Sequence, residues 1–358
     1  MDVSQLLERG KALGDAGRLR EALKLFDKVV KSDPDNAEAW FDRGVVLGRL
    51  NRLEEALECF NRVETLEPNY NKTWHNKGLV LGRLNRLEEA LECFNRAIEL
   101  NPDYEKAWYD KGVALIMLSR LEEALECFDR ATSLNPDDED AWYHKGITLY
   151  KLNRNEEALP CFDEALRINF ENPKVWMVKG IALNELRRFE EALECFDRVL
   201  ELKPDDDSAW FNKGVAIHGL GRADEALRCY EEAAKKNPKH TEAWNGIGFI
   251  LMKRGVHKEA IKNFDKSLKI DPNQFKTWFW RGASLIALGR ARDALKSFDR
   301  ALKLNPSDPS IWRAKAALLE AIGKVDEAAK CRKEAEKLQK KRRKVARSPM
   351  GFNDFPFS

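Results

Sequence analysis

The side chains best suited to metal binding or catalysis in this 358-residue chain are its seven cysteines and five histidines. Every cysteine falls at one phase of a 34-residue period: Cys59, Cys93, Cys127, Cys161, Cys195, Cys229 and Cys331. Equivalent positions on packed helices lie about 8–10 Å apart, which is too far for a disulfide or a shared metal. We therefore predict that the cysteines are small, buried packing residues with reduced thiols.

The histidines are scattered over five different phases of the same period: His75, His144, His218, His240 and His257. No His, Asp and Glu cluster has the spacing of metal ligands, and no Gly-rich loop suits a phosphate. No Ser or Cys has a general base placed by a motif. The sequence predicts no catalytic residue, no metal site and no cofactor, which indicates a protein that is not an enzyme.

The period itself decides how the chain is organised. Nine of the ten tryptophans are spaced 34 residues apart: Trp40, Trp74, Trp108, Trp142, Trp176, Trp210, Trp244, Trp278 and Trp312. One step back from Trp40 falls on Leu6, in a first unit that lacks the tryptophan. We expect ten units over residues 3–342, starting at residues 3, 37, 71, 105, 139, 173, 207, 241, 275 and 309.

The residue pattern within each unit predicts two helices. Trp40, Leu47 and Leu50 recur at helical spacing and are predicted to form the buried stripe of a first helix. Gly44 lies on that stripe and lets a second helix, marked by Ala56 and Phe60, approach closely. A residue suited to the left-handed C-cap follows most first helices: Asn51, Asn85, Asn153, Gly221, Gly255, Gly289 and Gly323. A proline closes most units.

This pattern of Trp, Gly, Ala, aromatic and Pro resembles the tetratricopeptide-repeat family over nearly the whole chain. The resemblance implies an all-α, right-handed superhelical solenoid whose first helices line a concave groove and whose second helices lie outside. Two positions depart from the family pattern: Lys or Arg replaces the Leu before the Gly, as at Arg43, and Leu or Ile replaces a Tyr.

In the resembled family, ligand-facing side chains stand one, five and eight residues after the Trp position. The first of these positions is rich in aromatic residues, and an extra tryptophan lies beside it in one unit; the candidate groove residues are Phe41, Tyr109, Tyr143, Phe211, Phe279 and Trp280. The second position, which runs from Val45 to Ala283, is better explained by packing between repeats. Trp280 is either a binding hot spot or an aromatic that fills a gap between units.

Charge is distributed unevenly along the chain. Residues 37–206 hold 23 Lys/Arg and 35 Asp/Glu, a net charge of −12, whereas residues 207–358 hold 32 and 18, a net charge of +14. The basic run from Lys337 to Arg347 is best read as a solvated helix end, with nucleic-acid binding as the alternative. Residues 343–358 are expected to be a flexible basic and aromatic tail that docks on a partner or in a groove.

The sequence favours a cytoplasmic, non-catalytic scaffold that binds a protein or peptide in its groove. Two alternatives stay open: a nucleic-acid-associated protein that uses the basic C-terminal third, and a regulatory arm of a multi-chain enzyme complex. Self-association through opposite charges or through the tail is also consistent with the pattern. No run of 18 apolar residues predicts a membrane span. Pro160, inside an expected second helix, predicts a local change of superhelical pitch.

Overall fold

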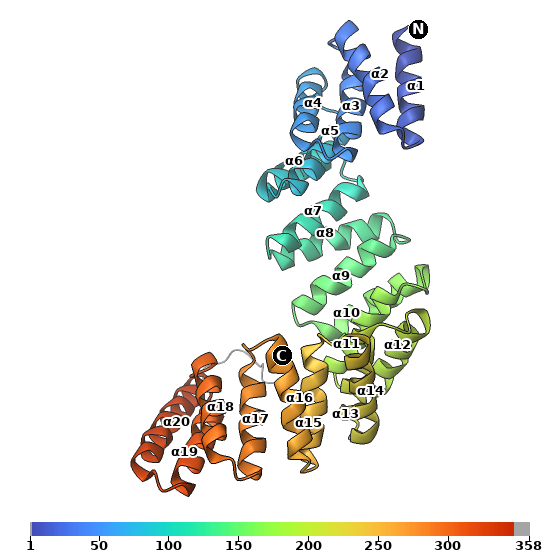
Figure 1. The fold of residues 1–358 in the computed structure, drawn as a ribbon. Coiled ribbons are helices and arrows are strands. Elements are labelled where there is room, and N and C mark those ends of the chain that lie inside the picture. The colour runs from blue at the N-terminus through green and yellow to red at the C-terminus, as the bar shows by residue number, and fades with distance from the viewer. Residues whose placement is uncertain (1, 347–358) are drawn as a thin grey trace. The chain divides into compact units, whose positions relative to one another are not determined.

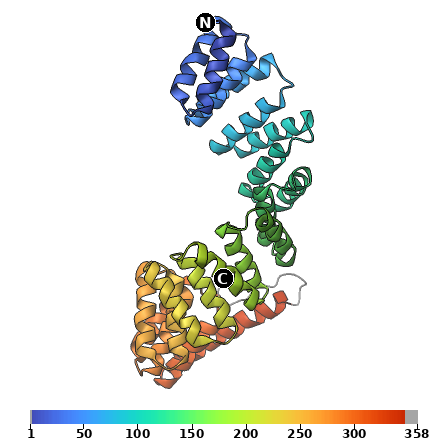
Figure 2. The same cartoon turned by 90° about the vertical axis from the view of Figure 1, so that its right-hand side faces the viewer.

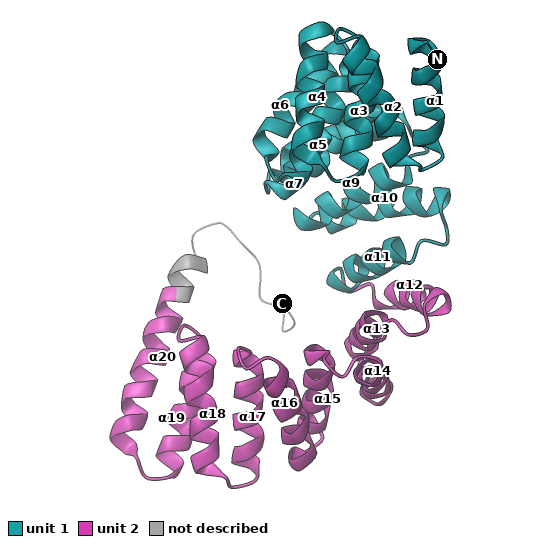
Figure 3. Ribbon diagram, turned by 45° about the horizontal axis from the view of Figure 1, so that its top comes forward, with its two compact units in different colours: residues 1–186 teal, residues 187–358 magenta. Residues whose placement is uncertain are grey.

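The computed structural model describes the backbone of residues 2–346 and the side chains as far as residue 341 (Figure 1). The described residues form twenty α-helices and no strand. Two compact units divide the chain between residues 186 and 187 (Figure 3). Within each unit, successive hairpins lie side by side in chain order (Figures 1 and 2). None of the described helices combines the length and the apolar character needed to cross a membrane.

The first helices of the hairpins share a length of 13 residues. Their bounds are α1 (Val3–Asp15), α3 (Ala37–Arg49), α5 (Asn71–Arg83), α7 (Glu105–Met117), α9 (Glu139–Lys151), α11 (Pro173–Glu185), α13 (Asp207–Gly219), α15 (Thr241–Lys253), α17 (Phe275–Ala287) and α19 (Pro309–Ala321).

The second helices share a length of 14 residues, except for the last, which has 22. Their bounds are α2 (Leu19–Ser32), α4 (Leu53–Leu66), α6 (Leu87–Leu100), α8 (Leu121–Leu134), α10 (Asn155–Ile168), α12 (Phe189–Leu202), α14 (Ala223–Lys236), α16 (His257–Ile270), α18 (Ala291–Leu304) and α20 (Val325–Ala346). Helix α20 thus continues past residue 342, where the last repeat was expected to end. The expected docking tail falls mostly on residues 347–358, which lie outside the described part of the chain.

Helix ends follow from local side chains. At the start of α3, the Asn36 side chain accepts a hydrogen bond from the Ala39 N–H at 3.0 Å, which satisfies one exposed donor of the first turn. After each first helix the backbone turns left-handed, and all seven residues predicted for this C-cap have positive φ. Ser119 and Arg187 adopt the same conformation at φ 60° although neither residue type favours it. Because their side chains carry no such signal, the sequence did not single them out.

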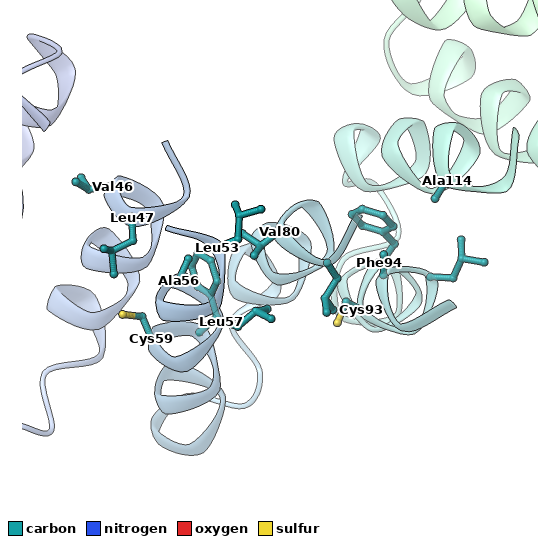
Figure 4. Close-up of a cluster of buried hydrophobic side chains, with 14 of the residues drawn as sticks. Val46, Leu47, Leu53, Ala56, Leu57, Cys59, Val80, Cys93, Phe94 and Ala114 are labelled. Carbon is teal, nitrogen blue, oxygen red and sulfur yellow. The ribbon is translucent and has the colours of Figure 1, made fainter. Parts of the chain in front are cut away.

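The core of most hairpins is a ring packed against a glycine. Ala56 and Phe60 of α4 are 0% and 1% exposed, and they lie in the apolar cluster shown in part in Figure 4. A Cβ placed on Gly44 would stand 2.8 Å from Phe60 Cε1, so only glycine allows this approach of α3 to α4. The last hairpin has Ala316 and Arg332 at the two positions, because no ring has to be accommodated there.

Pro160 lies at an exposed position inside α10, and the helix runs through it from Asn155 to Ile168 without a break. The bounds of α10 match those of the other 14-residue second helices, so the proline does not shorten the helix. The expected change of superhelical pitch stays a prediction.

Candidate protein-binding face

The repeated tryptophans hold the loops between repeats. In each case the indole Nε1–H donates to the backbone carbonyl six residues earlier, as from Trp40 to Pro34 at 2.9 Å, and the nine bonds span 2.8–3.1 Å. The expectation that Trp40 and Leu50 are buried with Leu47 was wrong in part. Leu47 is fully buried, whereas Trp40 and Leu50 are half-buried, because the indole lies over a surface loop.

The cations that replace the family's leucine have a packing role. Arg43 lies over the Trp40 ring at 5.6 Å, and its Nε donates to Asp27 Oδ1 of the preceding helix at 2.7 Å. The same cation–π contact, at 4.8–5.5 Å, recurs at Lys77, Lys111, Lys145, Lys179 and Lys213. All of these cations except Lys111 also pair with a carboxylate of the preceding helix, and these ion pairs join neighbouring repeats.

In residues 1–186, the candidate rings are half-buried and each rests on another ring. Phe41 of α3 packs on Phe60 and Tyr70, with centroids 6.0 and 5.3 Å away. Tyr109 of α7 packs edge-on against His144 of α9 at 5.4 Å, and its hydroxyl lies 3.2 Å from His144 Nδ1. Tyr143, which precedes His144 in the sequence, also contacts the His144 ring, with centroids 5.2 Å apart. Burial raises the pKa of the Tyr109 and Tyr143 hydroxyls, so both stay protonated.

The sequence did not foresee that His75 and Asp110 meet, because they are 35 residues apart. His75 is 5% exposed; its Nε2 lies 2.7 Å from Asp110 Oδ2, and the Tyr104 hydroxyl lies 3.0 Å from its Nδ1. A hydroxyl donor at Nδ1 leaves the ring proton on Nε2, where it donates to the carboxylate. This buried network ties α5 to α7 and satisfies its own polar groups.

In residues 187–341, two of the candidate rings, Phe279 and Trp280, lie on α17. Phe279 packs on Phe298 of α18 at 5.9 Å, and Trp280 contacts Phe249 of α15 and Phe264 of α16 at 5.1 and 6.1 Å. Trp280 therefore does fill space between repeats, yet its side chain stays half-buried.

Phe249 is the residue that the sequence assigned to packing and that the fold places beside Trp280. His218 of α13 approaches the Phe249 ring edge-on at 6.1 Å, and Lys253 Nζ lies over it at 5.5 Å. We call Phe249, Trp280, His218 and Lys253 the aromatic cluster. The sequence did contain a sign of this cluster. Phe249 is the one aromatic residue at the position five residues after the repeated tryptophan, where the other repeats from Val45 to Ala283 have Val, Leu, Ile or Ala.

Phe211 of α13 borders a separate, open hollow of about 450 Å³. Its ring lies 5.5 Å from Tyr230 and 5.0 Å from His240. The hollow is lined by Asp207, Ser208, Phe211, Asn212, Asn237, Lys239, His240 and Glu242. His240 Nδ1 lies 3.2 Å from Glu242 Oε2, and this hydrogen bond lowers the pKa of Glu242 to about 2.

The cysteines are buried and free, which confirms their prediction as packing residues. Burial raises the pKa of the Cys93, Cys127 and Cys161 thiols to about 11, so the nucleophilic thiolate is disfavoured. Among the described residues, no group of three or more His, Cys, Asp or Glu side chains is placed to hold a metal ion.

Three family models described as tetratricopeptide repeat match the chain: one over residues 181–341, one over residues 7–71 and 75–139, and one over residues 139–172. The chain belongs to the tetratricopeptide repeat family, and its fold is an all-α repeat solenoid.

The chain is also similar to solved repeat structures. A tetratricopeptide repeat protein from Parabacteroides merdae is 17% identical, covering 70% of this chain and 98% of its own, with a TM-score of 0.57. Yeast Tom70 is 14% identical over 96% and 94% of the two chains, with a TM-score of 0.50. YrrB, a TPR protein described as having an unusual peptide-binding site, is 26% identical over 52% and 96%, with a TM-score of 0.49. A comparison with curated proteins gives no match.

Proposed function

We propose that this protein is a non-catalytic scaffold that binds a segment of a partner protein along the face formed by its first helices. The observation that carries the proposal is the aromatic cluster. Its rings come from three successive first helices, α13, α15 and α17, so an extended or helical segment that crosses those helices would meet them one after another.

The residue types support a binding role for this cluster. Trp280 and Phe249 are half-buried and rest on other side chains, so binding would immobilise little additional rotamer freedom. Tryptophan is the residue type most enriched among binding hot spots. Lys253 beside the rings would favour a partner segment that carries an acidic residue next to an apolar anchor.

The first helices of residues 1–186 offer a second, separate stretch with more polar chemistry. Tyr109 and Tyr143 are half-buried on α7 and α9, and Met117 at the end of α7 is 57% exposed. Amphipathic rings and a flexible thioether suit a partner that buries apolar side chains and also accepts hydrogen bonds. We expect this stretch to contribute less affinity than the aromatic cluster, since Tyr109 already hydrogen-bonds to His144.

The test is selection of peptides from a displayed library on the immobilised full-length chain, followed by calorimetric titration of the selected peptides. We expect Trp280→Ala to weaken their binding by about ten-fold or more, since hot-spot truncations cost at least 2 kcal/mol. Raising the salt concentration should change the affinity little, in contrast to binding of nucleic acid.

The matched control is Val325→Ser, because Val325 is 63% exposed on α20 and lies outside this face. Both variants should melt like the wild type, apart from a small loss for Trp280→Ala where its ring fills space. Equal binding of the peptides to the two variants, or no enrichment of any peptide, would contradict the proposal.

A further inference from the structure

The second helices present two outward positions whose charge differs between parts of the chain. These positions are the second and sixth residues of each helix, for example Glu54 and Glu58 of α4. Helices α4, α6, α8 and α12 carry glutamate at both positions. We call the three successive helices α4, α6 and α8 the acidic ridge: Glu54, Glu58, Glu88, Glu92, Glu122 and Glu126. Helices α16 and α18 carry cations at both, which we call the basic ridge: Lys258, Lys262, Arg292 and Lys296.

All ten side chains are exposed, and none of them forms a hydrogen bond or an ion pair with another described residue. The adjacent position behaves differently. Glu55, the third residue of α4, accepts two hydrogen bonds from Arg52 at 2.6 Å, and Glu89 and Glu123 are held by arginines in the same way. The ridges therefore lack the direct ion pairs of the adjacent position, although Glu88 and Glu122 help to raise the pKa of Arg120 and Arg154 in the next repeat.

Local stability does not explain the ridges. Side chains four residues apart on a helix are neighbours, and like charges there cost about 0.2–0.5 kcal/mol per pair. A glutamate in the first turn, such as Glu54, is stabilised by the helix dipole, but Glu58 lies beyond that turn. Lys258 and Arg292 lie in the first turn and are opposed by the dipole. Arg62 lies four residues after Glu58 and offsets part of this cost, but the repulsion between the two outward positions of each helix remains.

We propose that the basic ridge of one copy of this chain docks on the acidic ridge of a second copy. Both ridges are built on the same repeat, so their rows of paired charges recur with the same spacing along successive second helices and can be matched row by row. The two ridges have opposite sign, and neither forms a direct ion pair with another of the residues that the structure describes. The near-zero net charge of +2 hides this complementarity.

The contact is polar and exposed, so each ion pair is weak and the association depends on the array of pairs. One chain carries both ridges, which permits either a two-fold dimer with two equivalent contacts or head-to-tail growth. Helix α2 also carries Arg20 and Lys24 at the two outward positions, but it supplies a single row where the basic ridge supplies two.

The test is sedimentation velocity of the full-length chain over a concentration series, at about 20 mM and about 500 mM salt. We expect self-association at low salt and monomers at high salt. The variant Lys258→Glu/Lys262→Glu/Arg292→Glu/Lys296→Glu should weaken self-association by about ten-fold or more, and so should Glu54→Lys/Glu58→Lys/Glu88→Lys/Glu92→Lys. An equimolar mixture of these two variants should associate again, because their reversed ridges are complementary.

Two control variants test whether self-association depends on the charge of the ridge and whether it is independent of peptide binding at the aromatic cluster. Lys258→Arg/Lys262→Arg keeps the charge and should associate like the wild type. Trp280→Ala should also self-associate normally, so the failure of this proposal and the failure of peptide binding can be told apart. Each charge-reversal variant keeps like charges four residues apart, and its helical circular dichroism and melting temperature should match those of the wild type.

Three outcomes would overturn the proposal. The first is a wild-type chain that stays monomeric at low salt at every concentration. The second is undiminished association of the basic-ridge variant, which would move the contact to Arg20 and Lys24. The third is a monomeric chain whose basic ridge binds duplex RNA, with binding lost in the basic-ridge variant, which would assign the ridge to nucleic acid.

Discussion

Residues 1–186 and residues 187–341 are built on the same repeat skeleton and differ in what they present to solvent. The first helices of the earlier unit carry hydrogen-bonded rings, such as Tyr109 with His144, whereas those of the later unit carry the aromatic cluster. The outward positions of α4 are acidic and those of α16 are basic. The comparison teaches that packing holds the glycine and ring positions constant, while exposed positions diverge without a change of fold.

The largest expected effect is on stability and comes from the glycine–ring contact that both units share. Gly44→Ala should lower the free energy of unfolding by about 2–3 kcal/mol, because its Cβ would stand 2.8 Å from the buried Phe60 ring. Gly82→Ala in the next repeat is the matched control, since no atom lies within 4 Å of its Cβ. It should raise stability by about 0.5–1 kcal/mol, as alanine favours helix. Urea unfolding checks both, and a loss for Gly82→Ala as large as that for Gly44→Ala would contradict this account.

Asp42 should make the stability of the earlier unit depend on pH. The equivalent residues of α15 and α17, Gly246 and Trp280, do not ionise. Asp42 is 20% exposed, and its Oδ2 has no hydrogen-bond partner among the described residues. Burial raises its pKa from 3.8 to about 6, although Lys11 Nζ lies 3.9 Å away and opposes the shift.

Because the folded carboxyl binds its proton at higher pH than the unfolded one, its unfavourable contribution is full above pH 6 and fades as the pH falls towards 4. Asp42→Asn should therefore stabilise the chain at pH 7 by on the order of 2 kcal/mol, with a much smaller gain at pH 4.5. Thermal unfolding at both pH values measures this difference. A gain that is the same at both would show that the charge of Asp42 is not responsible.

Tyr230, in the core of the later unit, is a tyrosine at a position where most repeats have phenylalanine. It is 1% exposed, and its hydroxyl lacks a hydrogen-bond partner among the described residues. Tyr230→Phe removes a buried polar group without a partner and should raise the free energy of unfolding by about 1 kcal/mol. The reverse change at an equivalent ring, Phe264→Tyr, should lower it. A loss of stability in Tyr230→Phe would mean that the hydroxyl has a partner.

The smallest expected effect concerns the turn between helices. Ser119 has φ 60° where Gly289 of the later unit has φ 72°. Ser119→Gly should stabilise the earlier unit by about 0.5–1 kcal/mol, because glycine adopts this conformation without a steric penalty. Gly289→Ser should cost the later unit a similar amount. Melting temperatures that move in the same direction for both exchanges would contradict the interpretation.

Much of the fold was readable from residue types at fixed spacing. The first helices begin at residues 3, 37 and 71 and onward in steps of 34, because the signals that start and end them lie within a few residues. The paired placement of Gly44 and Phe60, the buried cysteines and seven of the left-handed turns could be predicted for the same reason. The row of candidate rings was also visible, since its members stand at one position after each tryptophan.

The contacts of those rings could not be predicted, because they join residues from different helices. Tyr109 meets His144 and His75 meets Asp110, in each case 35 residues apart, and Trp280 rests on Phe249 and Phe264 of the preceding hairpin. The sequence by itself determined the repeat, the helix ends and the glycine–ring core, since these depend on local conformation and short-range packing. Only the tertiary structure decided which aromatic faces are covered and which charges are paired, because both depend on how each repeat stacks on the next.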